Sequence, residues 1–370
     1  MTDSDLFATR WHAVRQRLIA DQADALVLSR GSDLVYLSGY DAHALERLTA
    51  FVGAPNTDGI PTLFAPQLEV PLVTAMPDVF TISGWTDDQD PVAMVAEQIV
   101  GAQRVLVSDE MRADHLLALQ SLMPDTTFVS LSASLGGLRS IKSDAEMQAI
   151  QTVGGLANQV AAQLQSGEIP LVGRSEAEIA EDITARLLAV GHETVEFCIV
   201  ASGPNSASPH HHPGNRIVQA GEMVLCDFGG KHKGYCSDIT RCVWTGDIPA
   251  DVSATYDTLK KAQQAAVDAA RPGASLGDVD AAARNVIADA GFGSQFIHRT
   301  GHGIGTEVHE QPYVTKDNTQ VVEVGHAFSI EPGIYVEGKW GMRLEDIVVV
   351  VDDGAIRCST TDHNLIAVRA

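Results

Sequence analysis

The segment VLCDFGGKHKGYCSDITRCV, residues 224–243, has the pattern of a β-hairpin but carries an acidic residue in each arm. Two apolar runs flank a glycine-containing turn, as in paired strands. Asp227 and Asp238 therefore lie among residues that favour burial. Burying one unpaired carboxylate costs several kcal/mol or more, and a second one nearby adds to that cost. The pattern predicts a positively charged group between the two arms.

A second strand pair near the C-terminus repeats this feature. Glu331 follows the apolar run AFSI, and Glu345 precedes the run DIVVVV, so both lie among strand-forming residues. Taken alone, each acid has a simpler explanation. Asp227 could cap a turn, and Glu345, which stands beside Asp346, could face solvent. The repetition on two strand pairs favours one shared site.

The segment between the strand pairs, HRTGHGIGTEVHE, adds three histidines, at positions 298, 302 and 309. The glycines around His302 indicate a place where backbone and ligand approach closely. Two divalent cations would balance the four carboxylates and leave the imidazole neutral. Oxygen-rich ligation with one histidine favours Mn²⁺ or Co²⁺ over a structural zinc site, which would recruit cysteines. Two metals bridged by carboxylates lie ~3.5–4 Å apart and activate a shared hydroxide for hydrolysis.

The elements that must position these side chains show a weak internal repeat. Helical patterns begin at Ser175 and Ser275 and stop at Gly191 and Gly291, an offset of 100 residues at both ends. Each copy follows another helical pattern and precedes a strand-rich stretch. One interpretation is two amphipathic helices with common start and stop signals, because identity between the copies is low. The other is a duplicated α/β half whose hairpins meet at a pseudo-two-fold axis.

Residues 1–134 predict a separate N-terminal α/β domain. The strand-like runs are DALVLSR, TLFAP, VFTISG and RVLVSDE, and helical patterns lie near 6–20, 90–101 and 112–122. No cluster of ligand-type residues occurs in this part of the sequence. A glycine pair and a capping box, Ser143 with Glu146, then introduce a long helix. We place the second domain at 135–370.

The composition excludes several classes of partner. The chain has 25 Lys and Arg against 48 Asp and Glu, a net charge of −23, which argues against binding to nucleic acid or an anionic membrane. The N-terminus lacks an apolar signal segment, and the apolar runs are too short to span a membrane. The five cysteines show no Cys-x-x-Cys spacing and are interpreted as small buried hydrophobes. We expect a cytoplasmic protein without disulfides.

The acidic and histidine-rich blocks together resemble the metal-site blocks of the creatinase/aminopeptidase P/prolidase family. These blocks are CDFGGKHKGYCSDITRCV, GHGIGTEVHEQP and SIEPGIYVEGKWGMRLEDIVVV. The N-terminal α/β domain and the LRSIKS junction also resemble the family, so the resemblance covers the whole chain. It implies the pita-bread fold and a full set of metal ligands. These are Asp227, Asp238, His302, Glu331 and Glu345.

The resemblance also implies how these ligands are shared. Asp238 and Glu345 would bridge the two metals. Asp227 would chelate one metal, with His302 and Glu331 on the other. Mn²⁺ is the metal that we expect, with Co²⁺ or Zn²⁺ as alternatives.

A run of three histidines precedes the first hairpin. In SGPNSASPHHHPGNR, the Pro-His dipeptide stands 17 residues before Asp227, as in the family, and this assigns the active-site histidine to His210. His211 and His212 are interpreted as incidental neighbours. The alternative is a solvent-facing polar loop without a catalytic role.

Three more residues match family positions near the substrate. His309, seven residues after His302, resembles the second substrate-side histidine. His298 matches a pocket histidine of the aminopeptidase P branch, although a hydrogen-bonded core role is also compatible with its position. Arg343, two residues before Glu345, would order a bridging carboxylate or contact substrate.

The resemblance implies metal-assisted amide hydrolysis. A metal-bridging hydroxide would attack a carbonyl polarised by one metal and by His210, and Glu331 would move a proton to the leaving nitrogen. His309 would contact the residue after the scissile bond, which is proline in the prolidase-like branches. An Xaa-Pro bond is a tertiary amide without an N–H, so general peptidases handle it poorly.

We therefore expect an Xaa-Pro dipeptidase, active on small peptides and dimeric as is usual in the family. An aminopeptidase P acting on longer peptides is the main alternative. A metal-free creatinase-type amidinohydrolase and a non-catalytic binding protein fit less well, because all five ligands are present. A methionine aminopeptidase would not need the added N-terminal domain.

Overall fold

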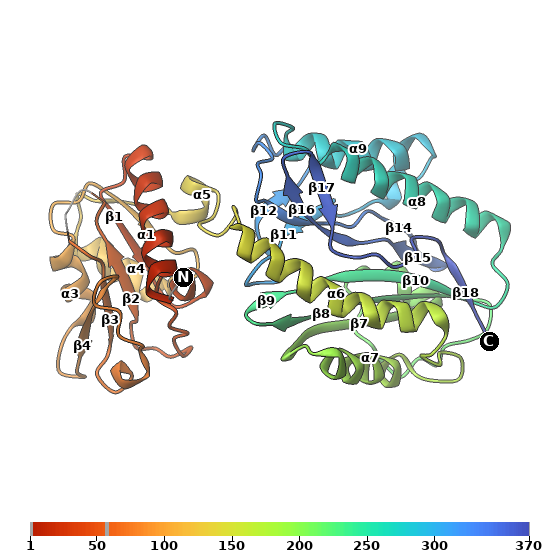
Figure 1. The fold of residues 1–370 in the computed structure, drawn as a ribbon, viewed down its shortest axis with the longest axis horizontal. Helices are drawn as coiled ribbons and strands as arrows, with labels where there is room; N and C mark the ends of the chain where they lie inside the picture. Colours follow the sequence, from red (N-terminus) through yellow and green to blue (C-terminus); the bar gives the residue numbers. More distant parts are fainter. Residues whose placement is uncertain (1–2, 56–58, 370) are drawn as a thin grey trace. The chain divides into compact units, whose positions relative to one another are not determined.

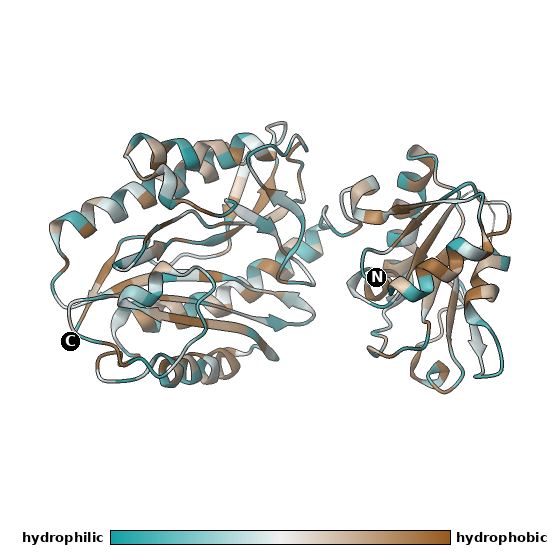
Figure 2. Ribbon diagram, turned by 180° about the vertical axis from the view of Figure 1, so that it is seen from behind, coloured by the Kyte–Doolittle hydropathy of each residue, from teal (hydrophilic) through white to brown (hydrophobic). Residues whose placement is uncertain are grey.

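The computed structural model describes residues 3–55 and 59–369. The chain forms two compact units, which meet in sequence between Arg139 and Ser140 (Figure 1). Each unit has its own hydrophobic core. Figure 2 shows that the strands of both units are mainly hydrophobic, whereas the helices alternate between hydrophobic and hydrophilic residues.

The first unit is built on one six-stranded mixed sheet. Its elements are α1 Asp3–Ala20, β1 Ala25–Leu28, α2 Ser32–Ser38, β2 Ala50–Gly53, β3 Thr62–Pro66, η1 Val70–Leu72, β4 Thr81–Trp85, α3 Pro91–Gln98, β5 Arg104–Val107, α4 Ala113–Leu122, β6 Thr127–Ser130 and α5 Leu131–Leu135. The strand order is β4-β3-β2-β1-β5-β6. Leu26 and Leu28 pack in the cluster that contains α1, whereas Ala25 and Val27 pack with α3 and α4. The alternation of strand side chains thus buries both faces of the sheet.

The sequence predicted part of this sheet. The run TLFAP coincides with β3, and the first four residues of RVLVSDE form β5. The predicted helices correspond to α1, α3 and α4. The pattern did not predict β2 or β6.

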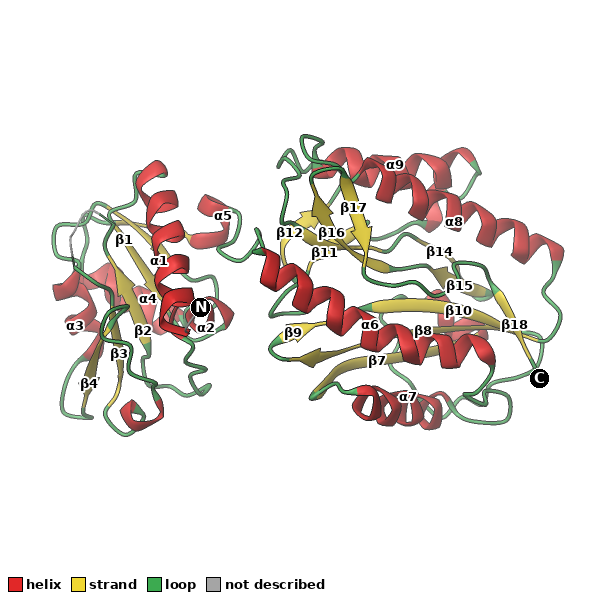
Figure 3. Cartoon of the chain, viewed as in Figure 1, coloured by secondary structure: helices red, strands yellow, loops and turns green. Residues whose placement is uncertain are grey.

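The second unit contains four long helices and three sheets. Its elements are α6 Asp144–Ser166, α7 Glu176–Val190, β7 Thr194–Ser202, η2 Gly203–Ala207, β8 Met223–His232, β9 Tyr235–Cys236, β10 Ile239–Thr245, α8 Ala250–Ala269, α9 Leu276–Asp289, η3 Gly293–Gln295, β11 Gly301–Gly303, β12 Glu310–Val314, β13 Ala327–Ile330, β14 Gly333–Val336, β15 Trp340–Arg343, β16 Asp346–Val351, β17 Gly354–Arg357 and β18 Ile366–Val368. The sheet orders are β18-β10-β8-β7, with β9 on β8, then β12-β11-β13-β16-β17, and β14-β15. In Figure 3 the four helices lie outside the strands.

The two helix starts of the predicted repeat are found in the structure, whereas α9 ends at Asp289 with Ala290 as its cap, one residue before the predicted Gly291. The Ser175 side chain accepts a hydrogen bond from the Glu178 N–H, and Ser275 accepts one from Asp278 in the same way. The helix that begins at Ser175 ends at Gly191, as predicted. Helices α6 and α7 cover the first set of strands, and α8 and α9 cover the second. The second unit therefore has the pita-bread architecture with two duplicated halves.

Two expectations concern the whole chain. Within residues 3–55 and 59–369, no helix combines the length and hydropathy needed to cross a membrane. All five cysteines are free thiols. Burial raises the pKa of Cys236 and of Cys242 to about 12, so both stay protonated and behave as small apolar side chains.

Candidate metal centre

The two aspartates of the first hairpin occupy different positions in it. Asp227 lies inside the long strand β8, directly opposite Thr240 of β10. Asp238 lies in the break between β9 and β10. The Cα of Gly229, beside this break, leaves no room for a side chain, because a Cβ there would stand 2.1 Å from the Ser237 carbonyl oxygen. The backbones of Gly229 and Ser237 therefore lie very close together at the point where Asp238 leaves the strand pairing.

The second hairpin is interrupted, which the sequence pattern did not predict. β13 pairs with β16, and β14 pairs with β15 in a separate two-stranded sheet. Glu331 and Glu345 lie at the two breaks, one directly after β13 and the other directly before β16. Because neither residue belongs to a ladder there, both carboxylates can turn toward the first hairpin.

The structure brings the five predicted ligands into one buried cluster. His302 Nε2 lies 3.3 Å from Glu331 Oε1 and 3.6 Å from Asp238 Oδ2. One ligand atom each of Asp238, His302 and Glu345 lies within 4.8 Å of the others. The exposed fractions of Asp227 and Asp238 are 8% and 6%. A metal ion between these atoms could contact several of them at once.

The donor set fits divalent cations. Asp227 Oδ1 and Asp238 Oδ1 are buried and accept no hydrogen bond from any described residue. His302 Nδ1 lies 3.1 Å from the Gly303 carbonyl oxygen, so this nitrogen carries the proton and donates it. Nε2 then has its lone pair free and faces the carboxylates, as in a metal-ligating histidine.

Burial governs the protonation of these acids. It raises the pKa of Asp238 and of Glu345 well above the ordinary range, and the neighbouring carboxylates raise both further. Burial also raises the pKa of Glu331 to about 7, although the Arg343 guanidinium opposes this shift. Divalent cations would reverse these shifts and keep the acids ionised as ligands.

Arg343 connects the two hairpins. Its Nη2 donates to Asp227 Oδ2 at 2.5 Å, and its Nε donates to Thr240 Oγ1 at 3.0 Å. The Thr240 hydroxyl in turn donates to Glu345 Oε2 at 2.6 Å. Arg343 therefore orients Asp227 directly and Glu345 through Thr240, which is the first of the two roles expected for it.

The other predicted histidines line the same cavity, whose volume is about 1050 Å³. His210 and His309 are exposed to it. The His309 ring lies edge-on to the ring of His302, with centroids 4.1 Å apart. His298 Nε2 lies 2.9 Å from the Tyr335 hydroxyl, and burial together with Arg343 lowers the pKa of His298 to about 4. His298 is therefore neutral at neutral pH.

Two residues of the site were missed at the sequence level. The Tyr335 hydroxyl accepts from Arg343 Nη1 at 3.0 Å and so links Arg343 to His298. A tyrosine inside an apolar strand signals that its hydroxyl needs a partner. Arg299 also lines the cavity, and its guanidinium lies 4.4 Å from the Tyr313 ring centroid. Neither residue has a ligand-type spacing that would have selected it.

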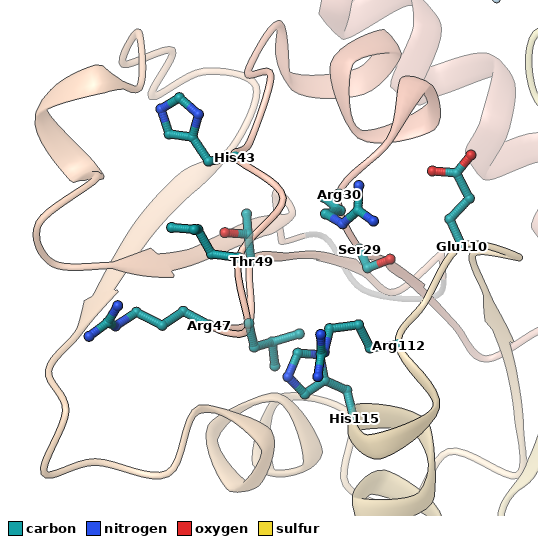
Figure 4. Close-up of a pocket in the computed structure, with 10 residues that line it drawn as sticks. Ser29, Arg30, His43, Arg47, Thr49, Glu110, Arg112 and His115 are labelled. Carbon is teal, nitrogen blue, oxygen red and sulfur yellow. The ribbon is translucent and has the colours of Figure 1, made fainter.

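A second, small cavity lies in the first unit (Figure 4). Arginines line it, but Arg47 pairs with Asp87 at 3.0 Å and Arg112 pairs with Asp114 at 2.7 Å. Its volume of about 10 Å³ holds at most one water molecule. The charges and the size argue against a substrate site here.

Comparison with known proteins identifies the family of the chain. The family described as metallopeptidase family M24 matches residues 147–352, and the creatinase/prolidase N-terminal domain matches residues 10–141. The chain belongs to metallopeptidase family M24. It is thus a metallopeptidase with the creatinase/prolidase domain arrangement, and the resemblance seen in the sequence is confirmed.

Individual members of the family resemble the whole chain. A probable dipeptidase PepE of Mycobacterium tuberculosis is 41% identical over 372 residues, covering 99% of this chain and 98% of that protein. The crystal structure of dipeptidase PepE from Mycobacterium ulcerans has a TM-score of 0.95 at 41% identity, with both chains covered completely. An Xaa-Pro dipeptidase of Lactobacillus delbrueckii subsp. lactis is 33% identical, covering 90% of this chain and 91% of that protein.

Proposed function

We propose that this M24 peptidase is an Xaa-Pro dipeptidase that uses two divalent metal ions. The observation that carries the proposal is the buried cluster of four carboxylates around His302, two of whose oxygens accept no hydrogen bond from the described residues. The names of its relatives, dipeptidase PepE and Xaa-Pro dipeptidase, support the substrate class.

Five residues would hold the metals. Asp227, Asp238, His302, Glu331 and Glu345 would hold them, because their side chains converge on one cavity. Mn²⁺ suits this oxygen-rich set, and Co²⁺ or Zn²⁺ could replace it. When bound, the two ions would supply a hydroxide at neutral pH and polarise the scissile carbonyl.

The remaining steps belong to side chains of the cavity. Glu331 would carry a proton from the attacking water to the leaving proline nitrogen. His210 would donate to the carbonyl oxygen as negative charge develops on it. His309, beside His302, would contact the proline after the scissile bond. The neutral His298 would help to hold Tyr335 and Arg343 in place.

Arg299 supports the dipeptidase specificity. Its guanidinium lines the cavity and makes no hydrogen bond or ion pair with any described residue. A guanidinium without an ion-pair partner among the described residues of the cavity suits the C-terminal carboxylate of a dipeptide. Aminopeptidase P activity on longer peptides is the second candidate, because a cavity of about 1050 Å³ lies at the upper end of the range for small-ligand sites, ~300–1,000 Å³.

The experiment that tests the proposal compares three peptides. Metal-free enzyme reloaded with Mn²⁺ is offered Ala-Pro, Ala-Leu and Ala-Pro-Ala in parallel. We expect Ala-Pro to be cleaved fastest, with both other peptides much slower. Comparable release of alanine from Ala-Pro-Ala would favour the aminopeptidase alternative. Failure to cleave any of the three with metal bound would reject the proposal.

A variant tests the role of Arg299. Arg299→Leu should raise KM for Ala-Pro by roughly 10-fold to 100-fold, the loss expected for one charged hydrogen bond. The amide Ala-Pro-NH₂ lacks the carboxylate and serves as the matched substrate, on which the variant and the wild type should be alike. An equal loss on both substrates would show that Arg299 does not read the carboxylate.

We further propose that the enzyme is cytoplasmic and homodimeric. The acidic composition, with a net charge of −23, is compatible with a cytoplasmic enzyme. Light scattering on the purified protein would measure its mass directly, and a mass equal to one chain of 39.4 kDa would reject the dimer.

A further inference from the structure

The three consecutive histidines of the cavity loop differ in what they contact. His210 and His212 are exposed, and their imidazoles make no hydrogen bond to any described residue. His211 is partly buried, and its Nε2 lies 2.8 Å from Glu176 Oε2. The middle histidine is therefore not the incidental neighbour that the sequence predicted. It faces a carboxylate 35 residues earlier in the chain.

Glu176 is fully buried at the first residue of α7. Its Oε1 accepts hydrogen bonds from the Ser202 N–H and hydroxyl, both at 2.8 Å, and from Asn205 Nδ2 at 3.0 Å. Its Oε2 accepts from His211. Ser202 ends β7, Asn205 lies in η2, and His211 lies in the loop that follows, so one carboxylate binds the chain on both sides of His210.

The backbone reinforces this anchor. The Glu176 N–H donates to the Arg216 carbonyl at 3.0 Å, and the Ala177 N–H donates to the Gly214 carbonyl at 3.0 Å. The start of α7 therefore holds the end of the loop as well. Burial alone would raise the pKa of Glu176, but the hydrogen bonds from His211 and Ser202 outweigh it and hold that pKa below its usual value. The anchor is thus a carboxylate, which a helix N-terminus stabilises further.

We propose that Glu176 and His211 form a positioning pair that fixes how His210 enters the catalytic cavity. The inference rests on the proposed role of His210 at the scissile carbonyl. Because His210 is exposed and makes no hydrogen bond of its own, its direction depends on the backbone of its neighbours. His211 is the adjacent residue, and Glu176 ties it to a rigid helix.

The size of the effect follows from the sensitivity of catalysis to geometry. A misplacement of about 1 Å at a reacting group can cost roughly 10²-fold in rate. Freeing the His211 side chain leaves His210 present but less ordered, so part of that loss is expected. The metals should stay bound, because neither Glu176 nor His211 is a ligand.

Kinetics of single and double variants test the proposal. With Mn²⁺ and Ala-Pro, His211→Ala should lower kcat by roughly 10-fold while KM and metal content stay close to those of the wild type. His211→Gln, whose amide can still donate to Glu176, should recover most of the loss. In a His210→Ala background the same His211→Ala change should alter kcat by less than about 2-fold, because residues acting as a unit are non-additive. An undiminished loss in that background would overturn the proposal.

A second readout does not require a substrate. In metal-free protein, hydrogen exchange of the peptide covering residues 202–214 should be faster in Glu176→Gln and His211→Ala than in the wild type. Asp182→Asn is the matched control, since Asp182 lies on the same helix but pairs with Arg174 and Arg186. It should change neither exchange nor kcat. Unchanged exchange in the two test variants would overturn the proposal, even if the wild-type enzyme proved to cleave no dipeptide and the proposed function failed.

Discussion

The two halves of the metal-binding unit differ at their first acidic residue, which is Asp227 in one half and Glu331 in the other. Each acid stands at the same distance from the start of a strand, but only Asp227 lies within its strand. Asp227 lies four residues after Met223, the first residue of β8, and Glu331 lies four residues after Ala327, the first residue of β13. β8 continues through its acid for five more residues, whereas β13 stops one residue before its own. At equivalent positions of the duplicated fold, Asp227 therefore lies within a strand, whereas Glu331 directly follows the end of one.

A single residue type explains this difference. Glu331 is followed by Pro332, which has no N–H and cannot continue a ladder, whereas Asp227 is followed by Phe228. Beyond a strand end, the backbone can direct a carboxylate side chain toward the site. Inside a strand, the pairing fixes the direction of the side chain, and a hydrogen-bond partner is needed to orient its carboxylate. Asp227 has such a partner in Arg343.

The halves therefore depend on each other. Arg343, from the second half, holds Asp227 of the first, and Thr240, from the first half, holds Glu345 of the second. Arg241 adds a third connection, since it donates to the Glu345 carbonyl at 2.6 Å and to Asp346 at 2.7 Å. The duplication supplies two similar sets of strands. Hydrogen bonds from each half to a carboxylate of the other half join the two sets into one site.

The largest effect should come from Asp238 and Glu345, two of the proposed metal ligands, one in each half. Asp238→Asn and Glu345→Gln should both abolish activity and lose metal, while the fold persists. The reason is that an amide cannot supply the negative charge that two cations share. Metal analysis, activity and circular dichroism on the purified variants measure the outcome. Retention of two tightly bound ions with unchanged turnover in either variant would disprove the corresponding ligand.

The next effect concerns the connection between the halves. Arg241 and Asp346 are both fully buried, and removing one partner of such a pair costs about 3–5 kcal/mol. Arg241→Met should therefore lower the free energy of unfolding by about 3 kcal/mol, near the lower limit because Asp346 keeps His363 at 2.6 Å. Urea unfolding measures it. Arg186→Met, which breaks a partly exposed pair with Asp182, is the control and should cost at most about 1 kcal/mol.

A third prediction compares two histidines of the loop that the first half contributes to the cavity. His210→Ala should keep both metals but slow turnover by roughly 10²–10³-fold, the usual loss for one donor to a developing oxyanion. His212→Ala should change kcat far less, because its imidazole has no partner in the described structure and His210 is intact. Steady-state kinetics on Ala-Pro decides between them. A greater loss in His212→Ala would show that the wrong histidine was assigned.

The smallest effect concerns the residue before each acidic strand. In the first half this is Glu222, which pairs with Arg216 at 2.6 Å, and in the second it is the fully buried His326. Burial, together with nearby Lys142, lowers the pKa of His326 from its ordinary value of 6.5 to about 4. Unfolded chains then bind more protons between pH 6.5 and 4, so His326 should cost stability as the pH falls through that window.

His326→Gln tests this assignment. The variant should flatten the dependence of the free energy of unfolding on pH between 6.5 and 4, by at most about 1.4 kcal/mol per pH unit. Equal slopes in wild type and His326→Gln would show that His326 titrates normally.

Much of the fold could be predicted because its signals are local. Ser143, Ser175 and Ser275 each have an acidic residue three positions later, and all three capping boxes form. The four acidic ligands attract attention because an acid among strand-forming residues is costly wherever the chain folds, and the family resemblance adds His302 to complete the set. These features depend on neighbours a few residues away, which is the range that a sequence pattern describes.

The tertiary structure alone decided which groups support those ligands and the loop that carries His210. Thr240 and Glu345 are 105 residues apart, Asp227 and Arg343 are 116 apart, and Glu176 and His211 are 35 apart. Such pairs depend on strand register, and a shift of one residue would turn every side chain to the opposite face. The sequence therefore determined the chemistry of this site, a set of carboxylates and one imidazole that require cations. Packing of the two halves determined how each carboxylate is held, because hydrogen-bond partners are chosen by distance in space.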